Sequence, residues 1–200
     1  MILLLVSLLI CVGAHELAHL FAAKLVGCGV LIYSVGFGKP YYQITFKGTQ
    51  YRISPWLLGG YCQLEGELEY TRKKEAFISL PYKKKLIVSL AGIATNVAMG
   101  LIATALGNYL NNVYLLYFGF LSFWLGITNL IPIPCLDGGY CFYYPILTKK
   151  FGYKKGTIIF ASWVKSTFKA IMWINVLSLI GFFMYLGYQL ITTGGINVSF

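Results

Sequence analysis

Apolar residues form long, nearly unbroken stretches along this chain, and polar segments separate them. Four stretches have about the length that a helix needs to cross a bilayer, roughly 20 residues: residues 1–26, 86–106, 113–134 and 170–191. We expect each to form a transmembrane helix. Residues 157–164 are also apolar but too few to cross alone, so they form either an interfacial turn or an early start to the fourth helix.

A different pattern occupies the first long polar region. Residues 42–47 and 49–54 alternate polar and apolar positions on either side of Gly48, which predicts a β-hairpin. Its edge could bind an extended peptide by strand addition, or the hairpin could simply cover the helices. The expected fold is an all-α polytopic membrane protein with about four transmembrane helices and a cytoplasmic membrane-associated β-hairpin. We expect one membrane domain over residues 1–200, with the hairpin loop at about 30–62.

Composition and charge agree with a membrane protein. The chain is 58% hydrophobic and 11% charged, which is too apolar for a soluble domain to bury. Its net charge is +10, and all 16 basic residues fall in 24–85, 149–155 and 165–169. The positive-inside rule therefore predicts a multi-pass protein of the cell membrane, with both termini outside and the main loops cytoplasmic. This distribution argues against a nucleic-acid partner. The charges of residues 65–85 are expected to set topology and attract lipid headgroups.

The first apolar stretch resembles a signal peptide only in its position. It has no Lys or Arg before Lys24, so we expect a retained span. The five cysteines include no C-x-x-C pair, and a disulfide framework is not expected. Cys11 and Cys135 lie near residues that could bind a metal, but packing as small buried hydrophobic side chains is the favoured interpretation.

Both histidines of the chain, His15 and His19, lie in the first predicted span. Their i, i+4 spacing places two imidazoles on one helix face, where both can reach one metal ion. Glu16 lies about 100° further round the helix and can reach a water beside that metal. This is the pattern of a zinc hydrolase. Ionisable groups in a membrane span are costly and usually functional, which disfavours a purely structural role.

Catalytic zinc usually takes three protein ligands, so a third is needed. Of the six acidic residues, Asp137 alone lies at the end of a predicted span outside the histidine motif. Pro132 and Pro134 forbid a regular helix just before it. Irregular backbone at membrane depth is tolerated where it is buried or lines a wet cavity. The alternative is an ordinary helix end at the interface, with Asp137 in a turn.

Several motifs together resemble the site-2 proteases, a family of intramembrane zinc metalloproteases. They are His15-Glu-Leu-Ala-His19, Val35-Gly-Phe-Gly-Lys-Pro40, Leu58-Gly-Gly-Tyr61 followed by Glu65-Gly-Glu67, Ala91-Gly-Ile-Ala-Thr-Asn96 and Asn129-Leu-Ile-Pro-Ile-Pro-Cys-Leu-Asp137-Gly138. Ile93 stands where the family usually has proline. The resemblance implies one Zn²⁺ per chain held by His15, His19 and Asp137, with Glu16 as catalytic base. It also implies substrate contacts at Asn129 and Asn96, in a compact member without a PDZ domain.

The expected function is therefore a zinc-dependent intramembrane endopeptidase acting in regulated intramembrane proteolysis. It would cleave transmembrane segments or remnant signal peptides near the cytoplasmic side, with a membrane-spanning protein or peptide and the lipid bilayer as partners. Two alternatives stay open. An inactive membrane scaffold could bind such segments without cutting them. A metal transporter would need a polar path across the membrane, and the external half of the chain offers none. The sequence does not indicate an oligomeric state.

Overall fold

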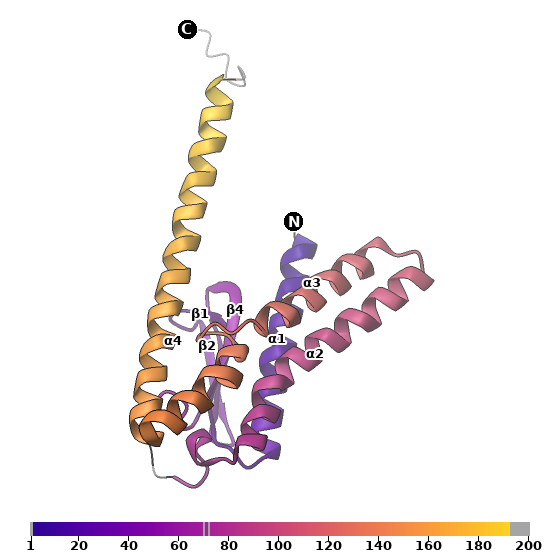
Figure 1. The fold of residues 1–200 in the computed structure, drawn as a ribbon. Coiled ribbons are helices and arrows are strands. Elements are labelled where there is room, and N and C mark those ends of the chain that lie inside the picture. The colour runs from indigo at the N-terminus through magenta and orange to yellow at the C-terminus, as the bar shows by residue number, and fades with distance from the viewer. Residues whose placement is uncertain (1, 70, 72, 193–200) are drawn as a thin grey trace.

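The computed structural model describes residues 2–69, 71 and 73–192. The elements are α1 (Ile2–Leu25), β1 (Val30–Phe37), β2 (Tyr42–Phe46), β3 (Thr49–Ile53), β4 (Trp56–Leu64), the 3₁₀ turn η1 (Phe77–Ser79), α2 (Tyr82–Tyr109), α3 (Val113–Asn129) and α4 (Asp137–Thr192). Figure 1 shows α1, α2 and α3 together on one side of the sheet, while the later part of α4 extends away from them.

The expectation of an all-α fold was wrong, because four strands form a mixed sheet with the order β2-β3-β1-β4. The predicted hairpin is present as β2 and β3, which pair in antiparallel register around the Lys47-Gly48 turn. It belongs to a larger sheet: β1 pairs parallel with β3 and antiparallel with β4. Residues 30–37 and 56–64 mix apolar residues with glycine and lack clean alternation, so the sequence pattern did not reveal them as strands.

The expectation of four transmembrane helices was also wrong. Among the described residues, two helices are long and apolar enough to cross a membrane, Leu5–Leu25 and Tyr82–Tyr109. The third predicted span ends early, because α3 has only 17 residues and stops before Pro132. Its length of about 25 Å is short of a hydrocarbon core of about 30 Å. Residues 170–191 belong to the longer helix α4 rather than to a separate element.

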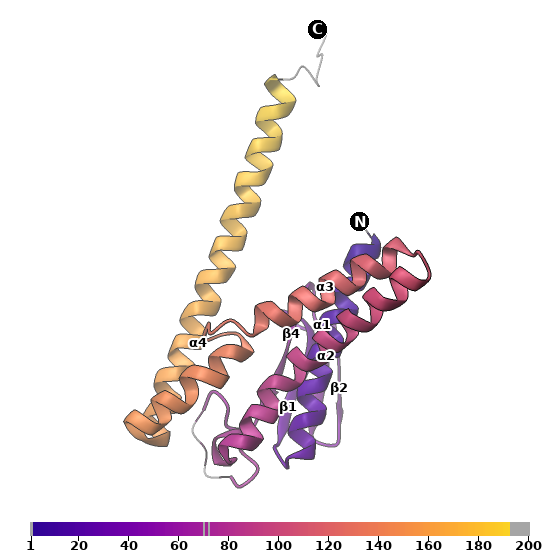
Figure 2. The same ribbon diagram turned by 45° about the vertical axis from the view of Figure 1, so that its right-hand side comes forward.

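Helix α4 changes direction at Gly152, whose backbone is non-helical (φ 76°, ψ 159°). Residues 157–164 follow this kink inside the same helix, so they are an early part of it rather than an interfacial turn. Figure 2 shows that α4 turns back at this kink, so that its second part passes the start of the helix and extends away from α1, α2 and α3. The tail after Thr192, predicted to lie outside the cell, is outside the described residues.

Helices α2 and α3 form an antiparallel hairpin that depends on small residues. A Cβ added at Gly100 would lie 2.7 Å from the backbone nitrogen of Phe123, and one at Gly119 would lie 2.9 Å from the carbonyl oxygen of Gly100. Close backbone approach of this kind is how helices associate in a lipid environment, where apolar side chains gain little by meeting each other. The turn between the helices is capped by Asn112, whose side chain accepts hydrogen bonds from Tyr114 N and Leu115 N.

The main hydrophobic core joins the end of α1, the sheet, η1 and residues of α4 on both sides of Gly152. Phe77 and Tyr144 are 1% exposed and Phe160 is fully buried, and they pack with Leu20, Ala23 and Val30 in one cluster. This core packs the C-terminal end of α1, which is predicted to face the cytoplasm, against α4. The proposed metal ligands therefore lie next to the best-packed part of the molecule.

Candidate metal centre

Helix α1 presents His15 and His19 on one buried face. The two residues are 5% and 7% exposed, and their Nε2 atoms lie 3.1 Å apart. The Nε2 atoms of the two rings therefore point toward one shared position, as the i, i+4 spacing predicts. This arrangement follows from one regular helix and needs no other element to create it.

Asp137, the first residue of α4, meets the two histidines from another part of the chain. Its Oδ2 lies 3.0 Å from His15 Nε2 and 3.2 Å from His19 Nε2. The ligand atoms of the three residues all lie within 4.8 Å of one another. Helix α3 ends at Asn129, and irregular backbone over residues 130–136 leads to Asp137. The unwinding expected around Pro132 and Pro134 is therefore what returns the chain to the histidines.

The other ring nitrogens of both histidines have partners of their own. His19 Nδ1 donates to the carbonyl oxygen of Val88 at 2.7 Å, which leaves the lone pair on Nε2. His15 Nδ1 lies 3.2 Å from Asn96 Nδ2, while the buried Asn96 Oδ1 has no partner. Rotating this amide by 180° lets Oδ1 accept from His15 Nδ1–H and satisfies both groups.

When both histidines carry their proton on Nδ1, the two Nε2 lone pairs and one Asp137 carboxylate oxygen face each other in a buried space. Such a donor set is repulsive unless a cation lies between the atoms, and two imidazoles with one carboxylate are a usual catalytic zinc set. Gly92 of α2 closes this space: a Cβ there would lie 2.4 Å from His19 Nε2 and 2.6 Å from His15 Nε2. The residues fit a zinc ion, and the ligand roles of His15, His19 and Asp137 stay predictions.

Glu16 contacts β4 and lies near the three proposed ligands. Its side chain packs on Gly60, where an added Cβ would lie 3.1 Å from Glu16 Cγ. Its carboxylate accepts a hydrogen bond from the Cys62 backbone and interacts electrostatically with His15, His19 and Asp137. Gly59 and Gly60 both lie in strand β4, and an added Cβ at either position would make close contacts.

The two asparagines assigned to substrate have different surroundings. Asn96 is fully buried beside His15, so its contact in this structure is with a histidine. Asn129 is partly buried and its Nδ2 donates to the Leu125 carbonyl oxygen at 3.0 Å. The structure brings Asn96 to the metal centre, and the substrate roles of both residues stay predictions.

Sequence reasoning missed the burial of two charged groups, which it expected to set topology and attract lipid headgroups. Lys85 is 6% exposed, donates to the Ile78 carbonyl oxygen at 2.9 Å and lies 5.0 Å from the Tyr144 ring centre. Glu67 accepts hydrogen bonds from Leu64 N, at 3.0 Å, and from the Tyr140 hydroxyl. Burial raises the pKa of Glu67 to about 7, and these hydrogen bonds oppose the rise. Unlike its exposed neighbour Glu69, Glu67 lies in the stretch Glu65-Gly66-Glu67 that resembles the family, but the resemblance implied no role for it.

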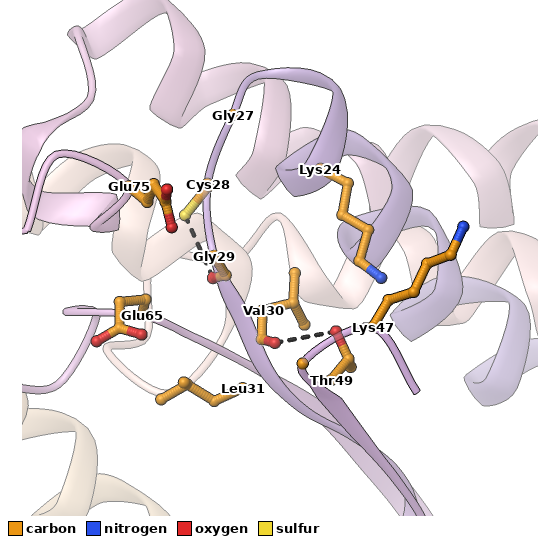
Figure 3. Close-up of a pocket in the computed structure, with 11 residues that line it drawn as sticks. Lys24, Gly27, Cys28, Gly29, Val30, Leu31, Lys47, Thr49, Glu65 and Glu75 are labelled. Carbon is orange, nitrogen blue, oxygen red and sulfur yellow. Dashed lines mark hydrogen bonds between the residues drawn. The ribbon is translucent and has the colours of Figure 1, made fainter. Parts of the chain in front are cut away.

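A separate cleft opens where the chain leaves α1. It has a volume of about 410 Å³ and carries Lys24 and Lys47 as well as Glu65 and Glu75. Figure 3 shows the lysines on one side of the β1 strand start and the glutamates on the other. Glu65 pairs with Lys73 at 3.1 Å. None of the three proposed ligands lines this cleft.

Comparison with known proteins supports a peptidase. The model of peptidase family M50 matches residues 3–116, more than half of the chain. A protein of Neisseria meningitidis serogroup A, provisionally named a zinc metalloprotease, is 33% identical over 63% of this chain and 26% of its own length. Another with the same provisional name, from Campylobacter jejuni, is 39% identical over 39% of this chain and 23% of its own. Zinc metalloprotease Rip1 of Mycobacterium bovis is 31% identical over 48% of this chain and 25% of its own length.

These matches cover about a quarter of the length of each relative. The family match includes His15, Glu16, His19 and Asn96 and ends before Asp137. Apolar helices long enough to cross a bilayer agree with the family and indicate membrane association. The resemblance to site-2 proteases is confirmed, and the chain belongs to peptidase family M50.

Proposed function

We propose that the chain is a zinc-dependent intramembrane endopeptidase that cleaves membrane-spanning segments, including remnant signal peptides, near the cytoplasmic side. One observation carries the proposal: three ligand atoms converge from α1 and α4, and the two histidines and Glu16 lie in α1, an apolar helix long enough to cross a membrane. Ionisable groups at such a depth are rare outside functional sites. The whole-protein names of the relatives support the same chemistry.

The ion would be held by Nε2 of His15, Nε2 of His19 and the carboxylate of Asp137. When bound there, zinc supplies a Lewis acid that activates water and polarises the scissile carbonyl. Asn96 and the Val88 carbonyl hold the imidazoles in the tautomer that leaves Nε2 free. Gly92 keeps the space between the ligands open.

Glu16 is the proposed general base. It takes a proton from the attacking water and returns it to the leaving amine, so the carboxylate is regenerated in each turnover. The Cys62 backbone and the packing on Gly60 fix the carboxylate on the side of the centre that faces β4. Substrate should therefore approach along this strand.

Strand β4 is better placed than the hairpin to hold a substrate. It is an outer strand of the sheet, whereas β2 lies at the opposite edge with β3 and β1 between. The amide of Cys62 points to Glu16, and alternate residues of a strand point the same way, so the Gly60 amide faces the same side. An extended peptide added at this edge would run past the catalytic carboxylate.

This mode of binding selects the substrate. A transmembrane helix hides its peptide bonds, and unwinding it in lipid leaves unpaired backbone groups that cost several kcal/mol each. The edge of β4 can pair with some of these groups. Favoured substrates should be single-span segments weakened by Gly, Pro, Asn or Ser near the cut, and replacing those residues with Leu should slow cleavage sharply.

The proposed orientation places the N-terminus outside and the two basic loops in the cytoplasm. A reporter that is active only outside the cell should be silent after Lys74 or Lys154 and active after Asn111. The α2–α3 turn, which contains Asn111, carries no Lys or Arg, in agreement with this assignment. The reverse pattern would overturn the orientation and leave the chemistry untouched.

The deciding experiment uses protein purified in detergent or nanodiscs and a library of single-span peptides. Cleavage should stop with a chelator and return with added zinc. Glu16→Gln should abolish cleavage while it keeps the metal, since it removes a base and not a ligand. Glu69→Gln, at an exposed glutamate, is the matched control and should cleave normally.

Other outcomes identify the alternatives. Wild-type protein that binds zinc and the peptides but releases no product is a scaffold rather than an enzyme. Zinc flux into sealed vesicles without cleavage indicates a transporter. Efficient cleavage of soluble unfolded protein, unaffected by a membrane span, would recast the chain as a membrane-tethered general peptidase.

A further inference from the structure

Glu67 is a partly buried carboxylate that the proposed chemistry does not use. It projects from the turn at residues 64–67, which is firmly held: Glu65 N donates to the Gly29 carbonyl oxygen at 2.8 Å, and Phe77 N donates to the Glu65 carbonyl oxygen at 2.7 Å. Gly66 has φ +67° and packs on Thr71 and Ala76, so a larger residue would disrupt the turn. Glu67 therefore starts from a fixed backbone.

The partner of Glu67 is Tyr140, whose hydroxyl donates to the carboxylate. The Tyr140 ring is wedged among aromatic side chains, with ring centres 4.7 Å from Phe160 and 6.1 Å from Phe77. Tyr140 lies three residues after Asp137, in the first turn of α4. The hydrogen bond thus joins a rigid turn after β4 to the helical turn that carries the proposed third ligand.

The position of Asp137 relative to the histidines depends on contacts between separate elements, whereas the histidines are positioned by one helix. His15 and His19 are fixed to each other by α1, whereas Asp137 follows the irregular segment 130–136 and belongs to a different helix. Two other contacts involve later residues of α4. The Tyr82 hydroxyl donates to the Cys141 carbonyl oxygen at 3.3 Å, and the Lys85 ammonium lies over the Tyr144 ring. The Glu67–Tyr140 hydrogen bond instead uses a side chain within the turn of Asp137 itself.

We propose that Glu67 is a positioning residue: through Tyr140 it fixes the first turn of α4 and thereby directs the Asp137 carboxylate toward His15 and His19. The proposal deepens the proposed function, because it rests on these three residues as the metal ligands. Glu67 itself touches neither metal nor substrate in this account. Outer partners of metal ligands typically change affinity by about 10- to 100-fold when removed.

The test uses Tyr140→Phe, Glu67→Ala, Glu67→Gln and the control Glu69→Gln in the full chain. The first measurement is hydrogen–deuterium exchange in chelator-treated protein, which requires no metal. Tyr140→Phe and Glu67→Ala should both accelerate exchange in residues 137–144. Glu67→Gln should restore protection, because an amide oxygen can still accept from Tyr140 and Leu64 N. Glu69→Gln should match wild type.

The second measurement is zinc affinity by competition with a chromophoric chelator, with the Co²⁺ absorption spectrum as a record of ligand geometry. Tyr140→Phe and Glu67→Ala should each lose about tenfold or more in affinity, and the double variant should lose no more than either single one. The Co²⁺ bands should shift in both variants and return in Glu67→Gln.

Unchanged exchange and unchanged zinc affinity in Tyr140→Phe and Glu67→Ala would overturn the proposal, and so would an equal effect of Glu69→Gln. A failure of the proposed function has a different signature. Protein that binds zinc with the expected variant pattern but never cleaves a peptide retains the positioning role and loses the protease assignment. If the wild type binds no zinc, the exchange data still decide whether Glu67 holds the α4 turn.

Discussion

The two halves of the candidate metal centre are built in opposite ways. His15, Glu16 and His19 lie within five residues of one regular helix, whereas Asp137 comes from a helix that begins after an irregular connection more than one hundred residues later. The first half depends on the geometry of a single helix. The second depends on α2, the sheet and α4 all packing correctly. Substitutions in α1 should therefore remove chemistry or ligands, and substitutions around α4 should change geometry.

The largest effects are expected in α1. Glu16→Gln should lower the cleavage rate by roughly 10²- to 10⁴-fold, the usual contribution of a general base, with zinc content nearly unchanged. His15→Ala should lose both zinc and cleavage, because it removes a ligand. Metal analysis of the purified variants beside the peptide assay makes the comparison. Equal zinc loss in the two variants would assign Glu16 a ligating or structural role instead.

The next largest effect is expected from a change that alters only the space around the proposed ligands. Gly92→Ala adds no charge and removes no ligand, but its Cβ would lie 2.4 Å from His19 Nε2. We expect zinc affinity and cleavage to fall together, by about 10-fold or more, as for other changes beside metal ligands. Gly181→Ala in α4 is the control, because a Cβ there meets nothing within 4 Å.

Both substitutions gain helix propensity, by about 1 kcal/mol in an exposed helix. A difference between them therefore reports contact with the imidazoles rather than backbone effects. Normal zinc affinity in Gly92→Ala would mean that α2 moves away from the histidines without cost, and the close packing of this centre would not be needed.

The contrast between the two halves also explains what the sequence could predict. The helical spacing of His15 and His19 is local, so the pattern alone was enough to place both on one face. Asp137 was found by exclusion among few acidic residues and by a motif, and prolines before it indicated the break in α3. The sheet was missed beyond its hairpin because β1 and β4 contain glycines that resemble loop residues. The close contact of Gly60 with Glu16 depends on tertiary packing, which no periodicity encodes.

Charge was the least informative signal in residues 65–85. Glu67 and Lys85 have the same composition context as exposed neighbours, yet one accepts from Tyr140 and the other is covered by aromatic rings. Basic residues before a span are usually attributed to topology. Burial of an individual member depends on which aromatic side chains α4 brings to it, and these lie more than fifty residues later in the sequence.

A smaller effect should come from Asn96, which supports a ligand without being one. Asn96→Ala leaves both imidazoles in place but removes the partner of His15 Nδ1. Zinc affinity should fall by about tenfold, at the lower end for an outer partner, and cleavage should recover at high zinc. Asn129→Ala is the comparison: it should leave zinc affinity unchanged. If cleavage of Asn96→Ala does not recover when zinc is saturating, Asn96 has a further role, such as the substrate contact that the family resemblance implies.

The smallest effect concerns pH and the link between β4 and α4. Burial raises the pKa of Glu67 to about 7 in the folded chain, from an ordinary value of 4.5. The folded state therefore binds more protons than the unfolded state between these values, so the contribution of Glu67 to the free energy of unfolding is greatest below about pH 4.5 and falls as pH rises through 7. Tyr140, His19 and Asp137 are the titratable groups that act on it. Glu67→Gln cannot ionise but keeps a hydrogen-bond acceptor, so its thermal midpoint should decline less between pH 5 and 8 than that of the wild type.

The measurement uses chelator-treated protein in one detergent, with Glu69→Gln as control, since that glutamate is exposed. Parallel midpoints for wild type and Glu67→Gln across this range would show that Glu67 is as well solvated when folded as when unfolded, and that the turn after β4 holds α4 without a buried carboxylate.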